Sequence, residues 1–372
     1  MAKRIKIVFV INSLGKGGAE NALYKLVRHI DLNVFDPVVV SIMPPDYYFG
    51  LLEDSGYKVH SLHEKKGLIS AFNMIGALKT HFKDADIVQG WMYHSNLLTW
   101  IAGKMTGVKH IYFNVRHSDT GIKNNKILTS LILRLGGVMS NSITRTIFVA
   151  KASYESHLKV GYNRNRAVVI PNGIDLKRYS GGTVKEKTRQ RRDTKQLLTL
   201  SRWHHNKDIP NLIHALSETK ESEFELILCG AGLDDDNSEL IELIRKNNLS
   251  EKVRLFGFRS DVIDIMKSAD LFVLPSATEG FPNVLIEAMA CELPCISTDV
   301  GDCREIIGDD RFIVPPENSE ALAVAIEHFF DMEHSEVELV IERNLQMVSD
   351  KYTLGNVVKT YEKLYMNCLQ RS

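Results

Sequence analysis

The sequence has no apolar run long enough to cross a membrane. After a basic start, the first apolar run, residues 7–11, ends at Asn12, which is also too short for the core of a secretion signal. None of the cysteines lies in the N-terminal half; they are Cys229, Cys291, Cys295, Cys303 and Cys368. Because the 291/295 spacing is unusual for zinc and histidines are lacking nearby, we expect buried thiols in a reducing cytosol.

Net charge is also lacking, but the two halves of the chain differ. Residues 1–175 hold 22 Lys or Arg against 12 Asp or Glu, a charge of +10, whereas residues 176–372 hold 24 against 34, a charge of −10. A basic domain favours contact with an anionic surface or an anionic acceptor. No stacking aromatics alternate with the basic residues and no nucleic-acid motif is present, so nucleic acid is not expected as a partner.

A chain of 372 residues is too long for one ordinary core and predicts two domains. In the first half, short apolar runs alternate with helical patterns, which predicts a parallel sheet covered by helices on both faces. The predicted strands are residues 5–11, 37–42, 58–62, 87–89, 110–114, 146–149 and 168–170, and the predicted helices are 19–30, 69–82, 96–105 and 127–139.

A charged stretch without apolar period, residues 176–195, is interpreted as a linker. The alternation then restarts and predicts a second domain of the same class. Its predicted strands are residues 197–201, 225–229, 253–256, 271–274, 295–298 and 312–314, and its predicted helices are 209–217, 238–247, 262–267, 284–290, 319–330, 335–348 and 354–369.

Two glutamates eight positions apart, Glu279 and Glu287, flank the start of a predicted helix after a buried strand. Gly280 allows a close backbone approach, and the first N–H groups of the helix, from Asn283 to Leu285, suit a diphosphate. Ionised carboxylates accept several hydrogen bonds from sugar or ribose hydroxyls. The segment therefore favours a nucleotide sugar as ligand.

Residues 279–287 resemble the E-x7-E signature of family 4 retaining glycosyltransferases. Further motifs follow in the order of that family: residues 17–20 after the first strand, residues 171–175 near the middle, Arg202 with Lys207, and residues 230–232. The resemblance spans about residues 5–370. It implies the GT-B architecture, an α/β fold of two facing Rossmann-like domains with parallel sheets and a C-terminal helix crossing back to the N-terminal domain.

The resemblance assigns the acceptor to residues 1–175 and the nucleotide sugar to residues 196–352, with residues 353–372 packing back on the first domain. The implied donor-binding residues are Gly17, Gly18, Phe258, Arg259, Gly280, Phe281, Asn283, Val284, Leu285 and Glu287. The implied catalytic residues are His117, Arg202, Lys207 and Glu279. The acceptor-side candidates are His94, where that family often carries a histidine, and Asp119, which could orient an acceptor hydroxyl or have no role.

Several of these positions have competing interpretations. Gly15 and Gly17 begin a nicotinamide-binding fingerprint, but Glu20 replaces its third glycine and no acidic residue ends a second strand at the required distance. An ordinary tight turn explains the same glycines. Ser95 or Asn96 could cap the helix after His94, and Phe256 is expected in the core, which leaves Phe258 and Arg259 for the base.

No metal or other cofactor is expected. Arg202 and Lys207 follow a buried strand and can neutralise the charge that builds on a leaving diphosphate. An Asp-x-Asp ligand pair is absent from every predicted strand end, and residues 234–236, all aspartates, are interpreted as the solvated cap of a polar helix. An ordinary surface pair is the alternative for Arg202 and Lys207.

The sequence therefore predicts a metal-independent retaining hexosyltransferase in the cytoplasm, at the inner face of the membrane. The donor would be an NDP-sugar, with UDP favoured, carrying a hexose or N-acetylhexosamine, and the acceptor a polyprenyl-diphosphate-linked oligosaccharide or another envelope glycan precursor. An NDP-sugar epimerase on the same fold is one alternative, but it needs further acid/base carboxylates. A non-catalytic nucleotide-sugar-binding partner is another, although it would be expected to lose one of the catalytic residues.

One helix suggests membrane docking. Ile127, Leu128, Leu131, Ile132 and Leu135 recur at helical spacing, and Lys123, Lys126 and Arg134 lie close to them in the sequence. Such a stripe more often faces a core than lipid. Electrostatic docking without insertion is the favoured form, because a polybasic surface gains about 1 kcal/mol per nearby Lys or Arg on anionic lipid.

Overall fold

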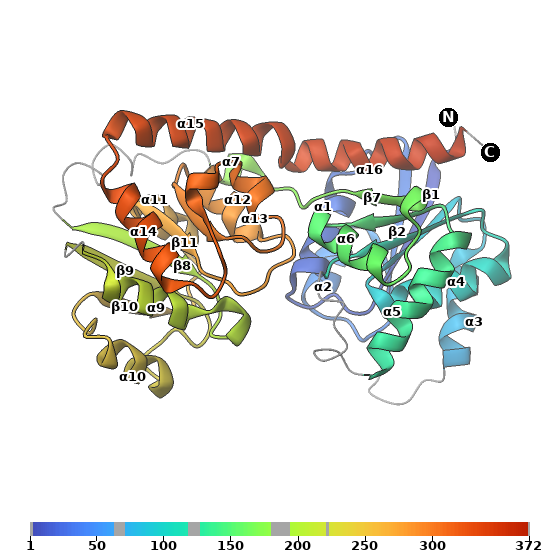
Figure 1. Cartoon of the computed structure of the whole chain (residues 1–372). Coiled ribbons are helices and arrows are strands. Elements are labelled where there is room, and N and C mark those ends of the chain that lie inside the picture. The colour runs from blue at the N-terminus through green and yellow to red at the C-terminus, as the bar shows by residue number, and fades with distance from the viewer. Residues whose placement is uncertain (1–2, 63–70, 118–126, 180–193, 221–222, 371–372) are drawn as a thin grey trace. The chain divides into compact units, whose positions relative to one another are not determined.

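A computed structural model of the chain describes residues 3–62, 71–117, 127–179, 194–220 and 223–370. The chain forms two units, each with its own parallel sheet and flanking helices (Figure 1). The N-terminal unit comprises residues 1–173 and 354–372, and the C-terminal unit comprises residues 174–353. The last helix therefore belongs to the first unit, in agreement with the fold that the resemblance implies.

All neighbouring strands of the N-terminal sheet pair in parallel, in the order β3-β2-β1-β4-β5-β6-β7. They are β1 (Ile5–Ile11), β2 (Phe35–Ser41), β3 (Lys58–Ser61), β4 (Ile87–Trp91), β5 (His110–Val115), β6 (Arg145–Phe148) and β7 (Ala167–Val169). Each overlaps a predicted strand. The largely buried strands β1, β2 and β5 carry apolar runs, whereas β3 is exposed at alternate positions.

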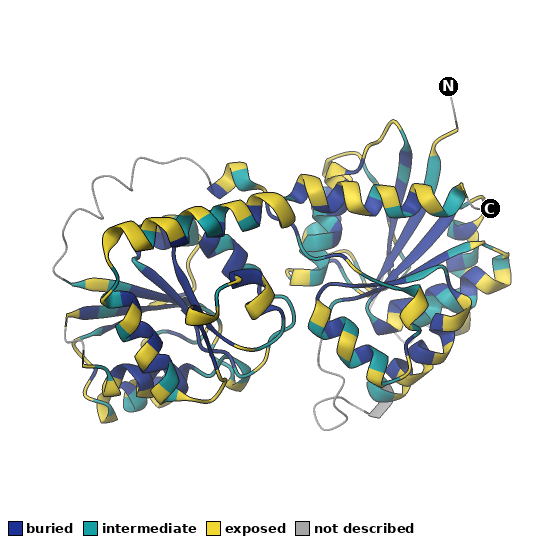
Figure 2. Cartoon of the chain, turned by 45° about the horizontal axis from the view of Figure 1, so that its top comes forward, coloured by how far each residue is buried: buried dark blue, intermediate teal, exposed yellow. Residues whose placement is uncertain are grey.

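Helices cover both faces of this sheet. They are α1 (Gly18–His29), α2 (Tyr47–Asp54), α3 (Ala71–Phe82), α4 (Tyr93–Thr106), α5 (Ile127–Met139), α6 (Lys151–Lys159) and α16 (Leu354–Leu369). Alternate residues of β1 point to opposite faces of the sheet. Phe9 packs in the hydrophobic cluster that contains α1, α2 and α16, whereas Val8 and Val10 pack in the cluster that contains α3 and α4. Figure 2 shows the strands as the buried centre and the helices with exposed outer faces.

The C-terminal unit repeats this architecture. Its parallel strands, in the order β10-β9-β8-β11-β12-β13, are β8 (Lys195–Leu200), β9 (Phe224–Cys229), β10 (Val253–Gly257), β11 (Leu271–Leu274), β12 (Cys295–Thr298) and β13 (Ile313–Val314). Its helices are α7 (Leu176–Tyr179), α9 (Ile209–Glu218), α10 (Ser238–Lys246), α11 (Val262–Ser268), α12 (Asn283–Ala290), α13 (Cys303–Ile307), α14 (Ser319–Phe330) and α15 (His334–Lys351).

In each sheet the chain runs outward from the first strand and then returns to that strand's other side. The strand order thus reverses between β1 and β4 in the N-terminal unit, and between β8 and β11 in the C-terminal unit. Open α/β sheets bind ligands at the carboxyl ends of the strands at such a switch point. The loops after these four strands are therefore the natural places for the predicted site residues.

Two helices of the N-terminal unit were not predicted. The α2 helix is short, and the Asp46 carboxylate caps it by accepting the Tyr47 N–H over 2.7 Å. The α6 helix buries Ser153 and His157 on its inner face instead of apolar residues. An apolar-period search cannot detect such a helix.

The boundary between the units lies at Gly173 and Ile174, ahead of the predicted linker at residues 176–195. Residues 176–179 form α7, whose Tyr179 is buried in the C-terminal core, so this part is not a solvated linker. Residues 180–193 lie outside the described part of the chain. A Cβ atom at Gly173 would lie 2.7 Å from the Leu354 Cα atom, so the outgoing and returning segments touch where only glycine fits.

Candidate active site

The C-terminal unit brings two predicted catalytic side chains into direct contact. Lys207 Nζ lies 2.5 Å from Glu279 Oε1, and both side chains are largely shielded from solvent. The Ser276 hydroxyl donates to the same carboxylate oxygen over 2.8 Å. A ligand could divide this pair, since phosphate oxygens accept from a lysine and sugar hydroxyls donate to a carboxylate.

The fold explains why these two residues meet. Lys207 follows β8 and Glu279 follows β11, and these strands are neighbours at the switch point. Their two loops are also joined directly, because the Ala277 N–H donates to the Asn206 carbonyl over 2.9 Å. Residues 72 positions apart are thus held by backbone contacts before any ligand binds.

Arg202 lies on the same loop after β8 and is exposed. Its loop is held against the turn after β9: Trp203 N–H donates to the Ala231 carbonyl over 2.8 Å. Gly230, at φ +143°, is required there, because a Cβ atom would lie 1.6 Å from the Ser201 carbonyl oxygen. In the described part of the chain no carboxylate pairs with Arg202. Its charge is therefore available to an anion.

The start of α12 differs in one detail from the prediction. The Leu285 N–H donates to the Pro282 carbonyl over 3.1 Å, so the expectation of a free donor at this residue is wrong. The first turn is tightened by this bond between residues three apart. Pro282 provides no side-chain cap, and the positive end of the helix dipole still favours an anion near Asn283 and Val284.

Glu287 lies within α12 and is partly buried. The Tyr179 side chain of α7 is hydrogen-bonded to it. Burial first, and then the Glu287 carboxylate, raise the pKa of the Tyr179 hydroxyl above its usual range, so this hydroxyl stays protonated and donates. Tyr179 was missed because its segment was interpreted as a linker.

The loop after β12 was also not predicted as part of the site. It packs against the backbone of Glu279 and Gly280. Gly301, at φ +57°, packs so closely that a Cβ atom would lie 2.4 Å from the Gly280 carbonyl oxygen. The Asp302 N–H donates to the same carbonyl over 3.1 Å. Burial raises the pKa of the neighbouring Cys303 thiol to about 12, with the Glu279 carboxylate acting in the same direction, so this cysteine is no nucleophile.

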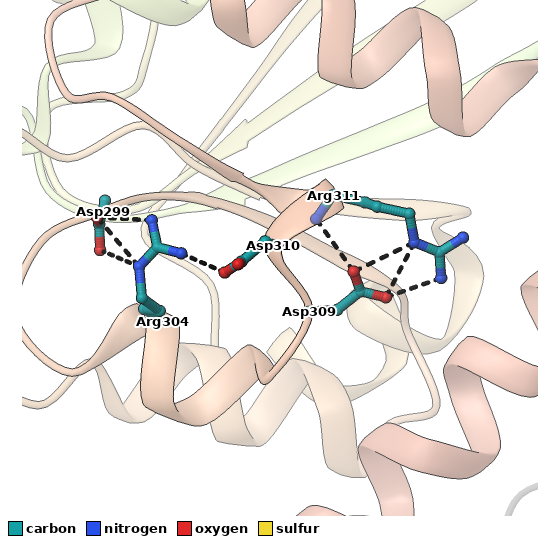
Figure 3. A network of polar contacts seen from close by, with 5 residues as sticks. All are labelled: Asp299, Arg304, Asp309, Asp310 and Arg311. Carbon is teal, nitrogen blue, oxygen red and sulfur yellow. Dashed lines mark hydrogen bonds and ion pairs between the residues drawn. The ribbon is translucent and has the colours of Figure 1, made fainter.

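Ion pairs hold the far side of this loop (Figure 3). The Arg304 guanidinium of α13 donates to Asp299 over 2.8–3.2 Å and also contacts Asp310. Asp309 accepts from Arg311 over 2.8 Å and from Arg343 of α15 over 2.5 Å. These contacts fix the loop that carries Gly301.

The predicted base-binding residues lie at the end of β10. Phe258 is 83% exposed, and Arg259 is paired with Asp261 over 2.6 Å. The expectation that Phe256 lies in the core is wrong: it is 40% exposed, because β10 is the edge strand of the sheet. Phe281, another predicted donor contact, packs its ring 5.6 Å from the ring of Tyr352.

In the N-terminal unit, the loop after β1 leads to Gly17, the N-cap of α1, and α1 begins at Gly18. A Cβ atom at Gly17 would lie 2.2 Å from Glu20 Oε2, whereas Gly18 has open space around it. The carboxylate of Glu20 thus occupies the start of this helix, which makes Gly18 the freer of the two glycines for ligand approach.

The histidine candidates lie at the ends of β4 and β5. His94 is exposed in the first turn of α4. The competing interpretation, that Ser95 or Asn96 caps this helix, is wrong, because the helix begins at Tyr93 and both residues lie buried within it. The Asn96 side chain instead accepts from the backbone of β5. His117 is exposed just after β5, and Asp119 lies outside the described residues.

Arg116, next to His117, was also missed. Its guanidinium donates to Asn114 over 2.8 Å and to the Tyr361 hydroxyl of α16 over 3.0 Å, and it contacts Asn172. It also lies 4.4 Å from the centre of the Trp91 ring. Burial lowers the pKa of this arginine. Arg116 therefore ties the end of β5 to the last helix.

Within the described residues no three His, Cys, Asp or Glu side chains are grouped as a metal site.

The interpretation of residues 234–236 as a helix cap is wrong: α10 begins later, and Asn237 caps it by accepting the Leu240 N–H over 3.1 Å. No helix in the described part of the chain has the length and hydropathy of a membrane span.

Two known protein families match the chain, one in each unit. Residues 16–178 match the family described as Glycosyltransferase Family 4, and residues 182–345 match the family described as Glycosyl transferases group 1. The two matches are adjacent, and one falls on each unit apart from a few residues at the boundary.

Two curated relatives match most of the chain. An N,N'-diacetylbacillosaminyl-diphospho-undecaprenol alpha-1,3-N-acetylgalactosaminyltransferase of Campylobacter jejuni is 24% identical over 351 residues, which is 88% of this chain and 90% of that protein. A UDP-Gal:alpha-D-GlcNAc-diphosphoundecaprenol alpha-1,3-galactosyltransferase of Escherichia coli is 25% identical over 316 residues, which is 82% of this chain and 79% of that protein.

Among solved structures, Anabaena Alr3699/HepE in complex with UDP matches with a TM-score of 0.84 and 20% identity, covering 98% of this chain and all of that one. The likeness extends over both units and confirms the fold. With the ordered motifs, the strand-end placement of Lys207 and Glu279, and the family matches, it leads to one conclusion: the chain is a glycosyltransferase of family 4 with the GT-B fold.

Proposed function

We propose that this glycosyltransferase moves a hexose or an N-acetylhexosamine from a UDP-sugar to a hydroxyl of a polyprenyl-diphosphate-linked glycan. Anomeric configuration is retained and no metal ion takes part. The observation that carries the proposal is the contact between Lys207 and Glu279 at the switch point of the C-terminal sheet.

The donor is held by the C-terminal unit. Lys207 and Arg202 neutralise the diphosphate, together with the start of α12. Glu279 accepts hydrogen bonds from hydroxyls of the transferred sugar, and Glu287 accepts from the ribose. Phe258, which is exposed, and the backbone near Arg259 pack against the base.

The acceptor is held by the N-terminal unit. His117 contacts the far side of the transferred sugar, Gly17 and Gly18 contact the donor, and His94 and Asp119 are the candidates for orienting the acceptor hydroxyl. The acceptor hydroxyl oxygen bonds to the anomeric carbon as the bond from that carbon to the diphosphate breaks. The hydroxyl proton passes to the departing diphosphate on the same face, so the products are UDP and the retained glycoside. This route needs no covalent carboxylate intermediate of the kind that retaining glycosidases form.

The choice of substrates is supported by the relatives. Both curated relatives named above act on sugars linked to undecaprenol diphosphate, one of them with UDP-galactose in its name, and the Anabaena structure contains UDP. A lipid-linked acceptor places this protein in the cytoplasm at the inner face of the membrane.

The α5 helix supplies a surface for that membrane. Leu131 is 54% exposed and Val138 is 71% exposed, and with Leu135 they form one apolar face at spacings of four and three. Arg134 is exposed between them, and the N-terminal half of the chain carries the excess of positive charge. The side chains of Ile127 and Leu128, with Lys123 and Lys126, fall outside what the structure describes, whereas Ile132 is buried.

The donor proposal is tested by titration calorimetry with UDP-, GDP- and ADP-sugars, followed by a transfer assay with an undecaprenyl-diphosphate-linked sugar. We expect binding of UDP-sugars alone and transfer with retention. Tighter binding of GDP- or ADP-sugars would overturn the choice of base, and epimerised donor without transfer would favour the epimerase alternative.

Membrane docking is tested separately, by cosedimentation with phosphatidylglycerol vesicles at low and high salt. Leu131→Glu with Val138→Glu should reduce binding, because it places carboxylates on the docking face. Leu339→Glu is the matched control, since Leu339 is 65% exposed but lies on α15 of the acidic half. Absence of vesicle binding at low salt would point to a soluble acceptor.

A further inference from the structure

The inner face of α6 is polar. Ser153 and His157, one helical turn apart, are both completely buried, whereas helices of this fold normally bury apolar residues there. Buried polar groups are unfavourable unless they are hydrogen-bonded. Ser153 and His157 therefore need hydrogen-bond partners inside the unit.

Ser153 and His157 form a chain of hydrogen bonds that ends at His117. His157 Nδ1 lies 2.6 Å from the Ser153 carbonyl oxygen, which can only accept, so Nδ1 carries the proton. Nε2 then accepts from the Tyr93 hydroxyl over 2.8 Å. The Ser153 hydroxyl donates to the His117 carbonyl over 2.8 Å. Each group in the chain has a defined donor or acceptor role.

Aromatic rings surround this chain and exclude water. The His157 ring lies 5.1 Å from Phe148 and 5.1 Å from Tyr162, and 5.8 Å from Tyr93. Phe148 and Tyr93 belong to the same buried cluster as Val115, the last residue of β5. The chain thus runs through packed core to the point where β5 ends.

We propose that Ser153 and His157 are positioning residues for His117. Ser153 fixes the His117 backbone carbonyl, and His157 fixes the first turn of α6 that carries Ser153. Arg116, the residue before His117, is itself anchored to α16. The backbone that carries the exposed imidazole of His117 is consequently fixed at its carbonyl group. This inference rests on the proposed role of His117.

The kinetic test uses the full-length protein with a UDP-sugar and a lipid-linked acceptor. Ser153→Ala should lower kcat by roughly 10-fold, since misplacement of a contacting group slows the reaction. UDP affinity should stay unchanged, because Ser153 lies in the other unit. Thr80→Ala is the matched control: its hydroxyl donates to Ala77 within its own helix over 2.7 Å.

A double-mutant cycle separates positioning from other effects. In a His117→Ala background, Ser153→Ala should cost nothing further, because Ser153 acts only through His117. An equal loss of kcat in both backgrounds would overturn the inference, as would an unchanged kcat in the single variant.

A second measurement does not depend on turnover. Side-chain ¹⁵N NMR should show His157 with its proton on Nδ1, and Ser153→Ala should shift or broaden the His117 signals while Thr80→Ala leaves them unchanged. Unmoved His117 signals in Ser153→Ala would reject positioning. If the signals move but no donor is turned over, the proposed transfer reaction fails while the positioning stands.

Discussion

The two units share one architecture, but their candidate site residues are held by different chemistry. The C-terminal unit uses charge: Lys207 pairs with Glu279, and Arg202 lies exposed nearby. The N-terminal unit uses neutral hydrogen bonds, with the chain through Ser153 and His157 ending at His117. The charged groups of the C-terminal unit match the charge of a diphosphate, whereas the hydrogen bonds of the N-terminal unit hold the His117 backbone in a defined position.

The strongest test of this comparison is Lys207→Ala. We expect kcat/KM to fall by roughly 100-fold or more, the loss typical when one group that stabilises a developing charge is removed. Donor affinity should also fall. The measurement is steady-state kinetics with a UDP-sugar.

Lys246→Ala is the control for that loss, because Lys246 also pairs with a glutamate in the same unit, Glu242 at 3.4 Å, but is exposed on α10. Equal activities of the two variants would mean that Lys207 only stabilises the loop after β8.

Acid should weaken the N-terminal unit first. Burial lowers the pKa of His157 to about 4 from an ordinary value of 6.5, so the unfolded chain binds more protons between these values. Stability is therefore complete above pH 6.5 and falls as the pH drops toward 4, by about 3 kcal/mol at most. Tyr93 and Tyr162 face the ring, and His117 lowers its pKa further.

The C-terminal unit should respond at lower pH. Hydrogen bonds from Arg311 and then Arg343 hold the pKa of the Asp309 carboxyl well below its ordinary 3.8, so its stabilising contribution is lost only below that pH. Denaturant unfolding from pH 7.5 to about 2 checks the order of the two losses. His157→Phe should flatten the loss between pH 6.5 and 4; an unchanged slope in this variant would assign the acid sensitivity to other groups, such as His81 and His110, whose pKa values burial also lowers.

Glu287→Ala should weaken UDP binding by about 1.5–3 kcal/mol, the cost of losing a charged hydrogen-bond partner. Titration calorimetry with UDP and with 2′,3′-dideoxy-UDP measures the effect. The wild type and the variant should bind the dideoxy compound alike, because it lacks the ribose hydroxyls. Glu242→Ala, an exposed glutamate in the same unit, is the control. An unchanged UDP affinity would remove Glu287 from the ribose.

The sequence allowed more of the candidate site to be predicted in the C-terminal unit than in the N-terminal unit. Most strands of both sheets contain an apolar run, and Lys207 and Glu279 lie in the loops that follow two of these strands. The switch-point topology then brings them together. The local sequence pattern and the fold agree at this position, so the proximity of Lys207 and Glu279 could be predicted.

The remaining parts depend on contacts that no local pattern shows. Arg116 meets Tyr361 across 245 positions, and Ser153 meets His117 from a helix with no apolar period. Tyr179 reaches Glu287 from a segment whose charged neighbours suggested a linker. Phe256 is exposed because its strand lies at the sheet edge, a position that only the strand order reveals.

Chelation should have the smallest effect of all. If Arg202, Lys207 and the start of α12 carry the charge of the leaving diphosphate, excess EDTA should leave kcat unchanged. The comparison of the two units then sharpens further, because the Lys207→Ala variant should remain impaired when Mg²⁺ or Mn²⁺ is added, since a free ion does not restore the ammonium group beside Glu279. Rates with EDTA, with Mg²⁺ and with Mn²⁺ are measured for both proteins. Loss of wild-type activity in EDTA with recovery on adding either ion would show that a cation, and not the two side chains, neutralises the diphosphate.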